Sequence, residues 1–291
     1  MIENDYLEGI EDIQDTQEDI VIEDITDITP EISDEIEDDE YFPLENEEVL
    51  REYLEEQTHG SADSQLELLC RKRPSWCDKI VWSWYIPQTD KAGYTAQYFV
   101  IFDFLDKSLT RWEDIKQKFQ ILTINNASWK RRWGANAKKI TINLDSFWDT
   151  SEFWQVLTHE FWHVVDLWVL CGKSKKINNQ YTEFWKAKFS VDDPSLEYYE
   201  YSWDSETVRS AKVIKKDFCS GYWMSDPFED FAECQNLFLN NRKLFQTMAK
   251  ESSIMKNKYN YFANLYDNQI LFDWWSKMQY EGWRPWDTTV I

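Results

Sequence analysis

The stretch that decides the fold is His159-Glu160-Phe161-Trp162-His163, near the middle of an apolar run from Glu152 to Leu170. Two residues four positions apart share one face of a helix, so His159 and His163 can bind a single metal ion. Glu160 lies roughly 100° further round the helix, beside such an ion, where a carboxylate can act as a general base. The pattern therefore predicts a buried helix that carries a zinc site.

The residues around this motif are apolar on nearly all sides, which is typical of a helix buried in a core. Polar groups in such a helix need partners, and two histidines lie there with two acids, Glu160 and Asp166. A metal site explains this concentration of polar groups. The simpler interpretation is a core helix whose histidines are only hydrogen-bonded. Asp166 is expected either to orient one of the histidines or to hold the helix predicted at 226–238 to the motif helix.

A zinc site of this kind needs a third protein ligand. No histidine follows His163, so that ligand must be Glu, Asp or Cys. The best source is the segment 226–233, which begins with a capping Asp and a Pro at the first helical position. Glu229 and Glu233 share one face of this helix, so one can bind the metal while the other accepts a histidine N–H. The competing sulfur ligands are Cys219 and Cys234.

These two motifs together resemble the gluzincin peptidases of the anthrax lethal factor type, which include the Pro-Pro endopeptidases. The resemblance lies in residues 159–166 (HEFWHVVD) and 229–233 (EDFAE) and covers about residues 140–240. It implies a zincin-like fold, with Zn²⁺ held by two histidines and by the first Glu of the second motif, Glu229. It also implies that the Tyr seven residues earlier, Tyr222, stabilises the oxyanion. The sequence departs from the family at Trp162, where a small residue is common, so the shape of the cleft is in doubt there.

The function expected from these residues is zinc-dependent hydrolysis of peptide bonds. Glu160 would take a proton from the activated water and deliver it to the leaving amine. A peptide or protein substrate would lie extended along a sheet edge, possibly the strand 139–144. The alternative is a non-catalytic zincin-like scaffold or binding protein whose metal is structural or absent. Glu160 argues against it, because a structural site has no use for a general base.

The negative charge of the chain is concentrated at its N-terminus. The formal net charge is −23, and residues 1–40 contain 18 acidic residues and no Lys or Arg. We therefore expect a disordered acidic tail at 1–45 and a zincin-like domain at 46–291. Without a basic stripe or a long charge-free apolar stretch, neither a nucleic-acid partner nor a membrane span is expected. The oligomeric state is left open.

The compartment is predicted from the N-terminus and the cysteines. No signal peptide precedes the tail, so the cytoplasm is the default, with secretion the alternative if the chain is trimmed. The five cysteines are too sparse for a disulfide framework. Cys70 and Cys77 are nevertheless close enough in sequence to bridge a short loop in an oxidising compartment.

The remaining patterns predict an α+β fold with a small, mixed or mostly antiparallel sheet. Strands are expected at 79–87 and 93–104, joined by a turn at 88–92, and at 140–144. Residues 130–139 are expected to form a solvated loop. Helices are expected at 47–57, up to Cys70, at 109–122, at 152–170, at 226–238 and within 256–280, so the C-terminal half is mainly helical.

Overall fold

The computed structural model describes residues 42–44, 47–83, 86–108, 119–125, 133–136, 138–144, 150–182, 187–219 and 224–269. All of them belong to one compact unit. They combine helices with a small sheet, so the predicted α+β class is confirmed. Of the predicted acidic tail, only residues 42–44 are described. Within the described ranges, no helix has both the length and the apolar character that crossing a lipid bilayer requires.

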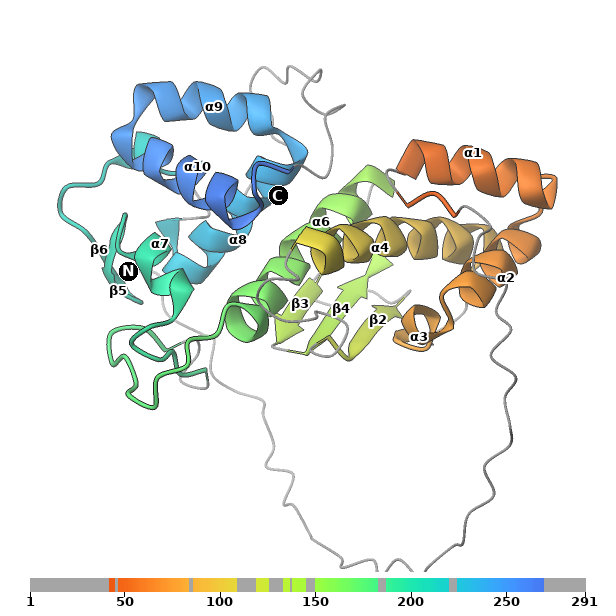
Figure 1. Ribbon diagram of the computed structural model, residues 1–291, viewed down its shortest axis with the longest axis horizontal. Helices are drawn as coiled ribbons and strands as arrows, with labels where there is room; N and C mark the ends of the chain where they lie inside the picture. Colours follow the sequence, from red (N-terminus) through yellow and green to blue (C-terminus); the bar gives the residue numbers. More distant parts are fainter. Residues whose placement is uncertain are drawn as a thin grey trace, which may run out of the picture. The chain divides into compact units, whose positions relative to one another are not determined.

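The first half of the chain supplies the sheet and the helices packed around it (Figure 1). Its elements are α1 (Glu47–Thr58), α2 (Ala62–Lys72), α3 (Pro74–Cys77), β1 (Ile80–Ser83), α4 (Gln88–Ser108), β2 (Ile121–Asn125), β3 (Trp133–Asn136) and β4 (Lys139–Asn143). The strands follow the order β1-β2-β4-β3. Strands β1, β2 and β4 are parallel, and β3 is antiparallel to β4. The sheet is therefore mixed, and the prediction of a mostly antiparallel sheet is wrong.

The prediction of a mostly antiparallel sheet is wrong because the sequence pattern did not indicate helix α4. It occupies the segment predicted as a turn and a strand, residues 88–104, and it lies between the parallel strands β1 and β2. Parallel neighbours need a crossover connection, which a helix commonly supplies. The five consecutive residues from Tyr98 to Phe102 have no exposed surface. A helix buried on all sides lacks the amphipathic period that separates a helix from a strand.

The structure also differs from two further predictions for the segments near the sheet. In the helix predicted for 109–122, residues 109–118 lie outside the described ranges, while Ile121 and Leu122 belong to β2. The predicted loop 130–139 contains strand β3. Because β4 pairs with both β2 and β3, the strand 139–144 is internal and is not the edge we predicted for substrate. Strand β3 forms that edge in the described part of the sheet.

The motif helix is α6 (Thr150–Val164), as predicted, and it contacts α4, β3, β4 and α8. Its Phe161 ring packs against Phe119, with ring centroids 4.9 Å apart. The helix continues into the π-helix η2 (Val165–Val169), where the Leu170 N–H donates to the Val165 carbonyl at 2.8 Å. Such π-turns are frequent at functional sites. The predicted extent to Leu170 is therefore confirmed.

The second half is mainly helical, as predicted for residues up to 269. Its elements are α7 (Pro194–Tyr199), β5 (Trp203–Ser205), β6 (Val208–Arg209), η4 (Lys215–Asp217), α8 (Pro227–Asn240), α9 (Arg242–Glu251) and α10 (Ser253–Leu265). The Asp226 carboxylate accepts the N–H groups of Phe228 and Glu229 at 3.1 and 2.9 Å, and Pro227 follows at the first helical position. This cap fixes where α8 begins and hence where Glu229 stands beside α6.

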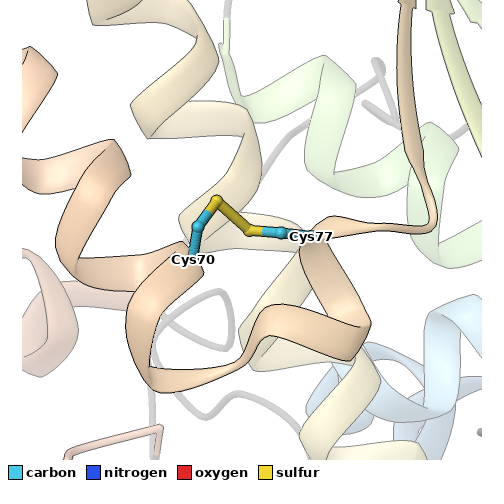
Figure 2. The surroundings of a disulfide bond; sticks show 2 residues. All are labelled: Cys70 and Cys77. Atoms are coloured by element: carbon cyan, nitrogen blue, oxygen red, sulfur yellow. A yellow bond between two sulfur atoms is a disulfide. The ribbon is translucent and has the colours of Figure 1, made fainter. Parts of the chain in front are cut away.

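A disulfide joins Cys70 in α2 to Cys77 in α3 (Figure 2). Their Cα atoms are 5.4 Å apart, within the range that a disulfide spans without moving the backbone. The short bridge that the spacing of these cysteines suggested is therefore present.

Candidate metal centre

Two histidines and one glutamate converge across the α6–α8 contact. His159 Nε2 lies 3.2 Å from one carboxylate oxygen of Glu229, and His163 Nε2 lies 3.9 Å from the other. The two imidazole rings are 5.1 Å apart. One donor atom from each of the three residues lies within 4.8 Å of those of the other two. The structure thus brings together the three predicted ligands as a possible metal-binding triad.

Glu233, one turn further along α8, contacts the other nitrogen of His159. One of its carboxylate oxygens pairs with Nδ1, while Nε2 faces Glu229. An acid on Nδ1 places the proton there and leaves Nε2 with its lone pair toward a metal. The geometry therefore separates the two glutamates that the sequence left open, with Glu229 at the triad and Glu233 behind His159.

Glu160 is buried beside the triad, with only 2% of its surface exposed. Burial raises the pKa of its carboxyl to about 8, the charge of His159 opposes this rise, and Glu229 and Glu233 add to it. Burial also lowers the pKa of His163 to about 4. For His159, burial acts to lower the pKa, but Glu233 and Glu229 outweigh it and raise the pKa well above its ordinary value. These shifts favour the neutral forms of Glu160 and His163 and the charged form of His159.

The fit of a metal ion can be judged from buried atoms. Glu160 Oε2 and His163 Nδ1 are buried and have no hydrogen-bond partner within the described residues. Buried polar atoms normally have partners, because an unpartnered one costs free energy. A divalent cation at the triad would compensate the buried carboxylates of Glu160 and Glu233 and the half-buried carboxylate of Glu229, so the residues present fit such an ion. We refer to these five residues as the histidine–glutamate cluster: His159, Glu160, His163, Glu229 and Glu233.

Comparisons of the chain with protein-family models, curated proteins and solved structures find no match. The interpretation of the cluster therefore depends on its own geometry and chemistry.

The other predicted site residues have different positions. Tyr222, the expected oxyanion donor, lies outside the described residues. Asp166 is buried in η2 and accepts a hydrogen bond from the Tyr199 hydroxyl of α7. Burial raises its pKa to about 7, against the effect of hydrogen bonds from Ser195 and Tyr199. The described hydrogen bonds of Asp166 thus go to α7, and not to a histidine or to α8, the helix predicted at 226–238.

Trp162, the residue that departs from the family pattern, is fully buried. Its ring lies 6.1 Å from that of Tyr266, just after α10. The Trp162 ring therefore packs into the core between α6 and the end of α10. The competing sulfur ligands, Cys219 and Cys234, contact each other and are not part of the triad.

A buried ion pair between α8 and α10, Asp230 with Lys258, was not predicted from the sequence. Asp230, next to Glu229, accepts the Lys258 ammonium at 2.7 and 2.8 Å and the Trp203 indole N–H at 3.1 Å. Lys258 and Asp230 have no exposed surface. A signal existed in α10, because Lys258 occupies the helical spacing of the apolar residues Met255 and Phe262.

Proposed function

We propose that this chain is a zinc-dependent endopeptidase whose catalytic centre is the histidine–glutamate cluster. The observation that carries the proposal is the convergence of three predicted ligands on one point with the carboxyl of Glu160 buried beside them. A structural metal site would need the triad but not this additional acid.

The donor set favours zinc over harder cations. Two imidazole nitrogens and one carboxylate are typical of catalytic zinc sites, which keep a further position for water or substrate. Magnesium and calcium are bound mainly by oxygen atoms. When bound, zinc would lower the pKa of a water molecule and polarise the scissile carbonyl.

The residues of the chain supply the remaining steps. Glu160 accepts a proton from the attacking water and returns it to the leaving amine, for which a carboxyl with a raised pKa is suited. Glu233 keeps the His159 ring oriented and its proton on Nδ1. The oxyanion role of Tyr222 depends on the family resemblance alone.

The substrate is proposed to bind along strand β3. This strand is antiparallel to β4, forms an edge of the described sheet and contacts α6, which carries the cluster. A peptide backbone can extend such an edge by main-chain hydrogen bonds. The Cys70–Cys77 disulfide favours an oxidising compartment, and hence the exported form of the protein over the cytoplasmic default.

The test is a library of quenched fluorescent peptides, assayed with and without a zinc chelator. Glu160→Gln should lower kcat/KM by at least about 10²–10⁴-fold, because it removes the general base, while the zinc content stays at the wild-type level. Glu52→Gln, an exposed change on α1, is the matched control and should leave the rate unchanged.

Two results would contradict this function. Full activity of Glu160→Gln would exclude the general-base role. Stoichiometric zinc in a wild-type protein that cleaves none of the peptides would favour the non-catalytic scaffold.

A further inference from the structure

Two cysteines outside the histidine–glutamate cluster lie in direct contact in the core. Cys219 follows η4 and Cys234 lies in α8, and neither has any exposed surface. Their sulfur atoms are 2.9 Å apart. A disulfide has a sulfur–sulfur distance of about 2.05 Å, so this is a thiol–thiol contact that needs only a small approach to become a bond.

The carboxylate next to this pair already has a counter-charge, which does not favour a metal site at the two sulfur atoms. Cys234 Sγ lies 3.6 Å from Asp230 Oδ1, the nearest carboxylate oxygen among its described contacts. That carboxylate already binds the Lys258 ammonium through both of its oxygens. Lys258 also lies 4.4 Å from the centre of the Phe218 ring, beside Cys219. The positive charge next to this carboxylate is therefore already supplied by Lys258.

We propose that Cys219 and Cys234 form a second disulfide bond, which joins the segment after η4 to α8. The bond forms by thiol–disulfide exchange with a small-molecule or protein disulfide, the same class of oxidant that Cys70–Cys77 requires. One cysteine thiolate attacks the oxidant to give a mixed disulfide, and the other cysteine then displaces the oxidant's sulfur. The two cysteines lose two protons and two electrons, and the oxidant leaves as two thiols.

The position of this bond gives it a consequence for the fold. Cys234 directly follows Glu233, but it lies roughly 100° further round α8, on the face toward η4 and Asp230. The bond would thus hold α8 on a face next to the one that carries Glu233 toward His159 of α6. The proposal is independent of the proposed peptidase activity, because it concerns only the state of two sulfur atoms.

Burial determines when the bond can form. It raises the pKa of the Cys219 thiol well above its ordinary value, despite the opposing charge of Lys258. A thiol that is both buried and protonated reacts slowly in exchange. We therefore expect the bond to form during folding and to resist reductant until the chain unfolds.

The first experiment is peptide mapping of the full chain, unfolded and refolded in a mixture of oxidised and reduced glutathione. The expected product is a peptide pair linked through Cys219 and Cys234, 2 Da lighter than the two thiol peptides together. The exposed Cys171 is the internal control and should be alkylated by iodoacetamide. Alkylation of both Cys219 and Cys234 after unfolding, with Cys70–Cys77 still linked, would overturn the proposal.

The second experiment separates a bond from packing. In a Cys70→Ala/Cys77→Ala background, dithiothreitol added during unfolding should lower Tm by about 5–10 °C, the effect expected of a disulfide that closes a loop of this length. Adding Cys219→Ala and Cys234→Ala to that background should abolish the effect of dithiothreitol. An equal Tm with and without the reductant in the Cys70→Ala/Cys77→Ala protein would also overturn the proposal.

Discussion

Helix α8 contributes to two groups of ionisable residues on neighbouring faces, the Asp230–Lys258 pair and the histidine–glutamate cluster. The two groups differ in how their charge is balanced. Asp230 is matched by the Lys258 ammonium and the Trp203 indole, so the pair is complete without a ligand. The histidine–glutamate cluster contains three carboxylates and two imidazoles, with buried atoms of Glu160 and His163 that have no hydrogen-bond partner in the described part of the chain. The first group is balanced by its own residues, whereas the second contains a triad that could hold a cation.

The pKa shifts agree with this contrast. Burial acts to lower the pKa of Lys258, but the Asp230 charge outweighs it and keeps the ammonium protonated. In the cluster, burial instead favours the neutral forms of both Glu160 and His163. Neutral histidine is the form that binds a metal.

Removing the positive charge of the Asp230–Lys258 pair should have the largest effect on stability. Lys258→Met leaves the Asp230 carboxylate buried without its counter-charge, which should lower the free energy of unfolding by about 3–5 kcal/mol. Denaturant titration followed by circular dichroism measures this change. The matched control is Lys256→Met, an exposed position on the same helix, with an expected change within about 0.5 kcal/mol. A loss for Lys258→Met no larger than that of the control would show that the pair is not structural.

The two glutamates of the cluster should differ in their effect on zinc affinity. Glu233→Ala removes only the partner of His159 Nδ1 and should weaken binding by about 10–100-fold. Glu229→Ala removes a ligand and should weaken binding further. Competition with a chromogenic chelator measures both, and Glu251→Ala on α9 serves as the exposed control. If Glu233→Ala proved the more damaging change, the two residues would exchange roles.

A smaller effect should appear in the pH dependence of the metal-free protein. Burial raises the pKa of Glu160 from 4.5 to about 8, so the folded state holds this proton more tightly than the unfolded chain. The resulting stability is complete below about pH 4.5 and is lost as the pH rises through about 8. Glu160→Gln should therefore flatten the fall in stability between pH 5 and 8, by up to about 1.4 kcal/mol per pH unit.

The measurement is the free energy of unfolding of zinc-free wild type and variant across this range. Glu52→Gln, on the exposed face of α1, is the control for the loss of an exposed carboxyl and should keep the slope of wild type. Equal slopes for Glu160→Gln and wild type would show that Glu160 is ionised in the folded, metal-free state.

The sequence predicted the site better than the sheet. Helices α6 and α8 have local signals, namely two histidines at helical spacing and the Asp226-Pro227 start, and both formed where expected. Helix α4 has no such signal, because it is buried all round and its composition matches a strand equally well. The order β1-β2-β4-β3 depends on that crossover helix, so the error in α4 carried over to the sheet.

Long-range pairings account for the rest of what the sequence did not predict. Nothing local to Asp166 indicates Tyr199, 33 residues away, and nothing near Asp230 indicates Lys258, 28 residues away. Such contacts depend on how α7 and α10 pack, which periodicity within one segment cannot specify. Likewise, only the packing of α8 against α6 shows that Glu229 faces Nε2 of His159 and Glu233 faces Nδ1.

The most direct test of the central claim is the zinc content of the purified chain by elemental analysis, after zinc loading and dialysis against metal-free buffer. Wild type should retain about one zinc ion per chain, because His159, His163 and Glu229 converge on a single point. His163→Ala should retain almost none while remaining folded. Zinc retention by wild type no greater than that of His163→Ala would contradict the account.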